Sequence, residues 1–369
     1  MTFDGSRPAI ADYVAIAREV GFGRPATVVD ALRALGGPPH EIAAALRSHH
    51  LLGFAQRALR EASAEERLSP ELLAALAAQR PIQRAAPEEL LATFDEVRRA
   101  LARAAIEARM LKGLYLAQRL YGGIDRRPQF DVDVLVRRRD LRRAVVVLRA
   151  AGFTSQAYDL HSRTVIRNGL KVDLHGSLRW APAYRIDEEA LWRRSRDVVI
   201  DGLSVPTLSD EDTLLLLLLA AFEDLGQATS NLKQLLDVAL FLRDVEPTAN
   251  WGDFFARRAR ENVLGVSVNA IAVVLDAFAM RDELPCLQAE LARHAGDVVH
   301  ADREAALALV GAPPKAAESL RWFRHVYPGS MLHYVAWFWA SGLPGNLRQI
   351  GRPWLAQSFG LFGRSPGAR

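Results

Sequence analysis

The sequence has almost no cysteine, few lysines and no long apolar run, and each shortage excludes a class of protein. The 369 residues include one cysteine, Cys286, so neither an internal disulfide nor a cysteine-based zinc site can form. The longest aliphatic run, residues 214–222, is far shorter than the roughly 20 residues that a membrane-spanning helix needs. The N-terminus lacks the apolar segment of a secretory signal, so we expect a cytoplasmic protein without a membrane span.

Several catalytic signatures are also missing. The chain has no Walker A loop, no Rossmann glycine fingerprint, no Gly-x-Ser-x-Gly and no His-Glu-x-x-His, which argues against P-loop kinases, dehydrogenases, α/β-hydrolases and zincins. The 47 basic and 43 acidic residues leave a net charge of +4. Because that balance is too even for a nucleic-acid coat, we expect no nucleic-acid partner.

The basic residues are unusual in kind. All are arginines except Lys112, Lys171, Lys233 and Lys315. In such an arginine-rich chain, the position of each lysine is informative.

Hydrophobic spacing divides the chain into a helical start, a mixed middle and a helical end. The predicted regions are residues 1–100 (helical), 101–206 (α/β), 207–345 (helical) and 346–369 (tail). Within the first region, residues 39–62 form one long amphipathic stretch. Within the last helical region, the aromatic-rich residues 331–340 are interpreted as a helix that packs into the bundle rather than as a membrane-surface or partner patch.

The middle region predicts a small mixed sheet with helices on one face. Asn168-Gly169 is a strong hairpin signal between two short apolar runs, at residues 164–167 and 170–174. The other predicted elements are strands within 106–111, 131–136 and 198–206, and helices at 114–121 and 139–151. The expected fold class is therefore α+β.

Three aspartates in this region indicate a metal site. Residues i and i+2 of a strand face the same side, so Asp131 and Asp133 project together. Two adjacent carboxylates repel each other unless a cation lies between them, and Mg²⁺ or Mn²⁺ suits such oxygen ligands. Asp173 lies on a later strand of the same predicted sheet. Three such carboxylates can hold two ions about 3.5–4 Å apart, as in phosphoryl and nucleotidyl transfer.

A phosphate-binding element is predicted upstream of the aspartates. Lys112-Gly113 ends a short strand and opens a helix, where glycine lets the backbone approach a phosphate and the first amides can hold it. Lys112 adds a point charge, and Arg127 precedes the aspartate pair, where it can clamp a leaving pyrophosphate. A purely structural role stays open for both side chains.

These segments resemble the uncharacterised nucleotidyltransferase family of the DNA polymerase β-like superfamily. The resemblance rests on Leu111-Lys112-Gly113, on Arg127 with the strand of Asp131 and Asp133, and on Val172-Asp173-Leu174-His175, and it extends to helices at 49–59, 211–214 and 232–237. It implies a nucleotidyltransferase core between two helical regions. It also implies that Asp131, Asp133 and Asp173 bind metal.

One departure from the superfamily pattern concerns phosphate binding. Lys112-Gly113 stands where the superfamily usually has Gly-Ser, so no serine hydroxyl is available there. His175 is interpreted either as a contact of substrate or of a metal-bound carboxylate, or as a buried structural histidine. We expect His49 and His50 to be structural, because no partner ligand lies at a useful spacing from them.

The leading hypothesis is a Mg²⁺- or Mn²⁺-dependent nucleotidyltransferase. It would use an NTP such as ATP as co-substrate and a small molecule, peptide or protein as acceptor. The alternative is a binding or scaffold protein that keeps the fold but has little turnover. A third hypothesis, a nucleic-acid enzyme, predicts steeply salt-dependent binding to RNA or DNA, and the near-neutral charge argues against it.

Overall fold

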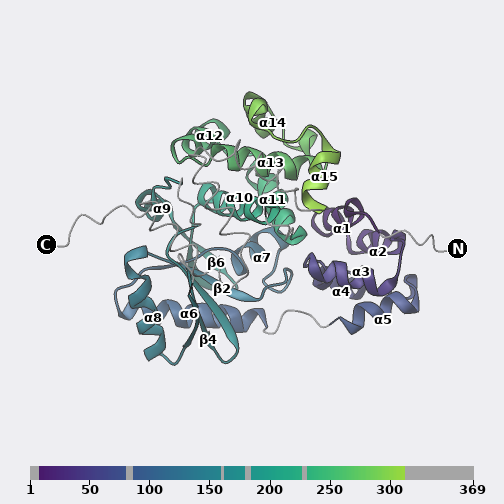
Figure 1. Cartoon of the computed structure of the whole chain (residues 1–369). Coiled ribbons are helices and arrows are strands. Elements are labelled where there is room, and N and C mark those ends of the chain that lie inside the picture. The colour runs from purple at the N-terminus through teal and green to yellow at the C-terminus, as the bar shows by residue number, and fades with distance from the viewer. Residues whose placement is uncertain (1–7, 80–85, 159–161, 179–183, 227–230, 312–369) are drawn as a thin grey trace.

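A mixed β-sheet lies between two groups of helices in the computed structural model (Figure 1). The structure describes residues 8–79, 86–158, 162–178, 184–226 and 231–311. Within these residues the predicted α+β class, a small sheet core flanked by helical regions, is confirmed. The aromatic segment 331–340 and the tail 346–369 lie outside them.

Helices form the first part of the chain, as predicted. They are α1 (Ile10–Phe22), α2 (Pro25–Ala34), α3 (Pro39–Ser48), α4 (Leu52–Ala62), α5 (Pro70–Ala78) and α6 (Pro87–Arg103), with a 3₁₀ turn at Glu65–Arg67. The Ser69 hydroxyl caps α5 by accepting a hydrogen bond from the Leu72 amide at 3.2 Å. The last of these helices, α6, packs against β1 and β2 of the sheet and so belongs physically to the core.

The single stretch predicted over residues 39–62 is wrong, because the structure divides it into α3 and α4. His50 has a left-handed backbone with φ of 58°, which ends one helix and redirects the chain before the next begins. No glycine or proline stands at the break itself, so spacing alone favoured one continuous helix.

The core contains seven described strands in the order β3-β4-β5-β2-β1-β7-β6. Their bounds are β1 (Ala108–Met110), β2 (Asp131–Val136), β3 (Thr154–Tyr158), β4 (Ser162–Arg167), β5 (Leu170–His175), β6 (Arg196–Ile200) and β7 (Leu203–Thr207). Strands β2 and β5 are parallel, as are β1 and β7, and the other neighbours are antiparallel. The predicted Asn168-Gly169 turn joins β4 to β5, with φ of 51° and 78°.

The helices α7 (Leu114–Tyr121), α8 (Leu141–Ala150) and α9 (Glu188–Arg194) belong to the core. On one side of the sheet, α6 packs on β1 and β2 and α8 packs on β3 and β4 (Figure 1). Val132 and Val134 of β2 are buried. Because side chains alternate along a strand, Asp131 and Asp133 point to the opposite face.

The C-terminal helices lie on the other side of the sheet (Figure 1). They are α10 (Asp210–Gly226), α11 (Leu232–Val245), α12 (Trp251–Arg260), α13 (Leu264–Ala277), α14 (Pro285–Leu291) and α15 (Arg303–Gly311). Helix α1 packs against α11 and α15, so the two helical regions meet each other as well as the core. No helix in the described part of the chain is long and apolar enough to cross a bilayer.

Candidate active site

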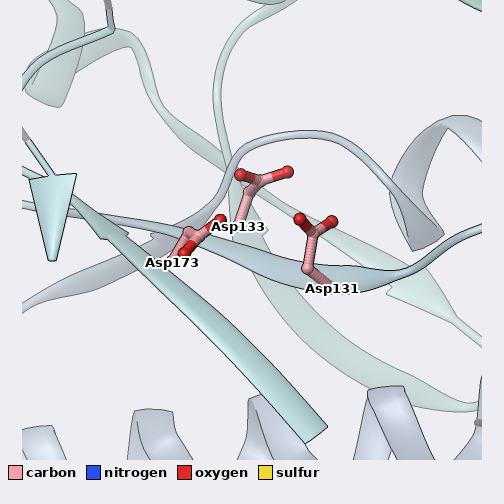
Figure 2. Close-up of side chains that lie close together, drawn as sticks. All are labelled: Asp131, Asp133 and Asp173. Carbon is pink, nitrogen blue, oxygen red and sulfur yellow. The ribbon is translucent and has the colours of Figure 1, made fainter. Parts of the chain in front are cut away.

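The three predicted aspartates meet on one face of the central strands. In the parallel pair of β2 and β5, Asp133 lies directly beside Asp173, and Asp131 lies one pleat earlier on the same face. One carboxylate oxygen from each lies within 4.8 Å of the others. Figure 2 shows the three side chains standing together on adjacent strands. We call Asp131, Asp133 and Asp173 the carboxylate cluster.

The carboxylate cluster carries unfavourable electrostatic energy. Burial raises the pKa of the Asp131 carboxyl above its ordinary value, and the Asp133 carboxylate raises it further. The ammonium groups of Lys112 and Lys171 act in the opposite direction, but they do not cancel the rise. Hard divalent cations prefer carboxylate oxygens as ligands, and a bound cation would relieve the repulsion among the three carboxylates. The residues therefore fit Mg²⁺ or Mn²⁺.

Neighbouring side chains hold the carboxylates in place. The His175 Nε2 lies 2.8 Å from Asp133 Oδ1, and the Thr164 hydroxyl donates to Asp173 Oδ1 at 2.6 Å. Thr164 is directly opposite Asp173 on β4, and His175 follows Asp173 by two residues on β5. The structure therefore places His175 against a carboxylate of the cluster, where it can orient the group.

Two of the four lysines also reach the carboxylate cluster. The Lys112 Nζ lies 3.4 Å from Asp133 Oδ2. The Lys171 Nζ lies 2.6 Å from Asp173 Oδ2 and 3.5 Å from Asp131 Oδ2. These cations offset part of the negative charge of the carboxylate cluster.

The strand–Lys-Gly–helix element forms as predicted. Gly113 is the N-terminal cap of α7 and has a φ of 67°, a conformation that side chains rarely adopt. A Cβ atom at this position would also lie 3.1 Å from the Gln129 Oε1. The glycine thus allows a close approach between the turn and the segment before β2.

A cavity of about 160 Å³ adjoins the carboxylate cluster. Its walls come from Lys112 and Gly113, from the segment that leads into β2, from α10 and from the start of α11, and His50 adds a side chain from between α3 and α4. Both helical regions therefore contribute to the cavity, together with the core. A concave space lined by charged, polar and apolar groups is typical of a ligand site.

The family of the chain follows from comparison with known proteins. The sequence model of a family described as "Uncharacterised nucleotidyltransferase" matches residues 37–295. The chain belongs to this family. The match spans the carboxylate cluster, the cavity and most of the helices on both sides, so the resemblance found in the short motifs extends over the greater part of the chain.

Comparison with solved structures gives a weaker likeness. A protein described as an antigenic nucleotidyltransferase-like protein from Paracoccidioides brasiliensis aligns with 56% of this chain and 93% of its own, at 14% identity and a TM-score of 0.34. No curated protein matches the chain.

In this family member, Arg127 lines the cavity and is buried in an ion pair. Its Nε and Nη2 donate to the two carboxylate oxygens of Asp237 on α11, at 2.9 and 2.5 Å. The Tyr121 hydroxyl donates to the same carboxylate at 2.8 Å. We call Arg127, Asp237 and Tyr121 the buried ion-pair network. It ties the segment before β2 and the end of α7 to α11.

Sequence reasoning missed two residues at the cavity. His50 was expected to be structural, but it lines the cavity with its ring 5.2 Å from the Phe130 ring. Lys233 was noted only as a rare lysine and as part of a matching helix; it is buried in the cavity wall, with its Nζ 3.4 Å from the Pro128 carbonyl oxygen. The scarcity of lysine is the signal that could have selected Lys233, whereas no local pattern marks His50.

Proposed function

We propose that this protein is a divalent-metal-dependent nucleotidyltransferase that moves an NMP from an NTP to a hydroxyl group. The observation that carries the proposal is the carboxylate cluster on adjacent strands, beside a lysine-glycine helix start and a cavity. The acceptor would be a small molecule, peptide or protein, because a net charge of +4 with nearly equal numbers of acids and bases does not favour nucleic acid.

The residue roles follow from position. Asp131, Asp133 and Asp173 would hold Mg²⁺ or Mn²⁺, which when bound stabilises charge on the phosphate oxygens. Lys112 and the first amides of α7 at Gly113 would bind the phosphates. Arg127, fixed by Asp237, would face the leaving pyrophosphate from the cavity wall. His175 would keep the Asp133 carboxylate oriented.

The reaction balances without a further co-reactant. The acceptor oxygen attacks the α-phosphorus, the bond from that phosphorus to the bridging oxygen of the β-phosphate breaks, and pyrophosphate leaves. Asp173, beside the cluster's other carboxylates, takes the proton of the acceptor hydroxyl. The contribution of the protein is positioning and charge stabilisation, which are the main sources of rate in such transfers.

Calorimetry with four nucleotides tests the proposal. We would titrate ATP, GTP, CTP and UTP into the protein with and without Mg²⁺. We expect at least one nucleotide to bind only with the metal, and the double variant Asp131→Asn/Asp133→Asn to lose at least 90% of that affinity. The variant Glu65→Gln/Glu66→Gln removes two exposed carboxylates outside the cavity and is the matched control, expected to bind normally.

Failure of this test has a clear form. If folded wild-type protein, checked by circular dichroism, binds none of the four nucleotides with Mg²⁺, the proposal is wrong and the result favours the alternative of a scaffold protein. Equal binding by wild type and the double aspartate variant would remove the carboxylate cluster from the proposal.

A further inference from the structure

Three buried polar atoms of residues that line the cavity lack a hydrogen-bond partner among the described residues. They are His50 Nδ1, Gln129 Oε1 and Gln234 Nε2. The three residues belong to separate parts of the chain: the break between α3 and α4, the segment before β2, and the first turn of α11. Because folded proteins pair nearly all buried polar atoms, three orphaned atoms in one cavity indicate a ligand that completes them.

The Gln129 amide is the best fixed of the three. The side chain is only 2% exposed, and its Nε2 donates to the Ile124 carbonyl oxygen at 2.9 Å. That bond assigns the amide orientation and leaves Oε1 as the acceptor. The Oε1 lies beside Gly113, at the turn where the phosphates are proposed to bind.

His50 contributes a neutral ring. Burial, together with the smaller effect of the nearby Lys233 charge, lowers the pKa of His50 to about 4, so the imidazole is uncharged at neutral pH. Its contact with Phe130 holds the ring in the wall. Gln234, whose backbone amide is capped by Asn231, adds an amide donor from α11.

The cavity brings charged groups together with uncharged hydrogen-bonding side chains. The carboxylates of Asp131 and Asp133 and the basic groups of Lys112, Arg127 and Lys233 share it with the uncharged side chains of His50, Gln129 and Gln234, which carry the orphaned atoms. A nucleotide combines the same two kinds of chemistry, an anionic triphosphate and an uncharged nucleoside rich in donors and acceptors. A volume of about 160 Å³ has room for one sugar or base, with the phosphates outside it along the cluster.

We propose that His50, Gln129 and Gln234 bind the nucleoside part of the NTP by hydrogen bonds. This inference rests on the proposed function, because it takes the triphosphate to lie at Lys112 and Gly113. It gives the N-terminal helices a direct part in substrate binding through His50, a residue outside the sheet core. It also makes these three side chains the determinants of the preference for binding a nucleotide rather than inorganic triphosphate.

The test separates nucleoside binding from phosphate binding. Calorimetry with Mg²⁺ would compare inorganic triphosphate with ATP, GTP, CTP and UTP on wild type and on His50→Phe/Gln234→Leu, which keeps the ring and the side-chain bulk. We expect the variant to lose at least tenfold in affinity for the nucleotide that wild type binds, while its affinity for inorganic triphosphate stays within twofold. His49→Phe, at the neighbouring histidine outside the cavity, is the matched control.

Each other outcome identifies which idea fails. Unchanged nucleotide affinity in the variant would overturn the inference, and the cavity would then be a candidate site for the acceptor. Equal weakening of nucleotide and inorganic triphosphate would also overturn it, since a general distortion of the site does that. If wild type binds neither ligand, the proposed function itself fails; if it binds both with the same affinity, only the nucleoside subsite fails.

Discussion

The site contains two sets of charged residues, the buried ion-pair network and the carboxylate cluster, which differ in how their charges are balanced. In the buried ion-pair network, Arg127 and Asp237 are 6% and 1% exposed and are joined by two hydrogen bonds, so each charge has a well-placed partner. In the carboxylate cluster, three like charges converge, and Asp131 remains 31% exposed. In the buried ion-pair network the charges neutralise each other and join α11 to the core, whereas the carboxylate cluster needs added positive charge to balance its carboxylates. Unbalanced charge next to a cavity therefore marks the ligand site better than charge alone.

The largest effect should come from breaking the buried ion-pair network. Asp237→Ala leaves the Arg127 guanidinium buried without its counter-ion and removes the partner of the Tyr121 hydroxyl. We expect the free energy of unfolding to fall by about 3–5 kcal/mol, measured by urea denaturation.

A double variant checks the cause. Arg127→Met/Asp237→Leu replaces both charges by apolar groups of similar size and should recover most of the lost stability, because the buried charges themselves contribute little net stability. A single variant as stable as wild type would mean that this pair does not hold α11 to the core.

Much of the carboxylate cluster could be predicted because it depends on local rules. The i, i+2 alternation places Asp131 and Asp133 on one face, and the Asn168-Gly169 turn sets the register of the strand that carries Asp173. The helix predicted at residues 114–121 also matches the observed α7.

The parts that could not be predicted depend on distant contacts or on strained backbone. Arg127 and Asp237 are 110 residues apart in sequence, and nothing local pairs them. The left-handed conformation at residue 50 is adopted by a histidine and not by a glycine, so the sequence did not predict the helix break that brings His50 to the cavity. Strand β3, at the sheet edge, has the mostly polar sequence Thr-Ser-Gln-Ala-Tyr and lacks the apolar alternation that marks a strand.

Lys233 lines the same cavity as residues of the buried ion-pair network and of the carboxylate cluster, and it gives a pH-dependent test of the comparison. Burial, together with the smaller effect of the Arg127 guanidinium, lowers the pKa of Lys233 to about 7. We expect Lys233→Met to raise the free energy of unfolding at pH 6 by about 1–3 kcal/mol, net of the lost contacts with Pro128 and Phe130, because an uncharged chain avoids the cost of burying an ammonium.

The sign of the pH dependence follows from the proton balance. Between pH 7 and the ordinary lysine value of 10.5, the unfolded wild type holds a proton that the folded state has released, so its stability rises with pH. The advantage of Lys233→Met should therefore shrink over that interval in denaturation curves. A constant difference from pH 6 to pH 10 would show that Lys233 does not titrate in this way.

The smallest predicted effect concerns a lysine ammonium group beside the carboxylate cluster. Lys171 is paired in register with Asp131 and stands two residues before Asp173, so its ammonium is held on the metal-binding face by the backbone. A divalent ion entering the cluster would meet this charge. We expect Lys171→Met to tighten Mn²⁺ binding to the free protein about tenfold, equivalent to about 1.4 kcal/mol, as measured by the electron paramagnetic resonance signal of unbound Mn²⁺.

The modest size of this effect has a physical reason, and two variants test it. The Lys171 side chain is 44% exposed, so solvent screens its charge and the flexible stem lets the ammonium move aside. Lys171→Arg keeps the charge and should bind Mn²⁺ like wild type, and so should Arg139→Met, which removes a cation whose side chain is 74% exposed. Equal tightening in Arg139→Met would assign the effect to net charge. Tightening confined to Lys171→Met would show that the Lys171 ammonium already offsets part of the negative charge of the carboxylate cluster.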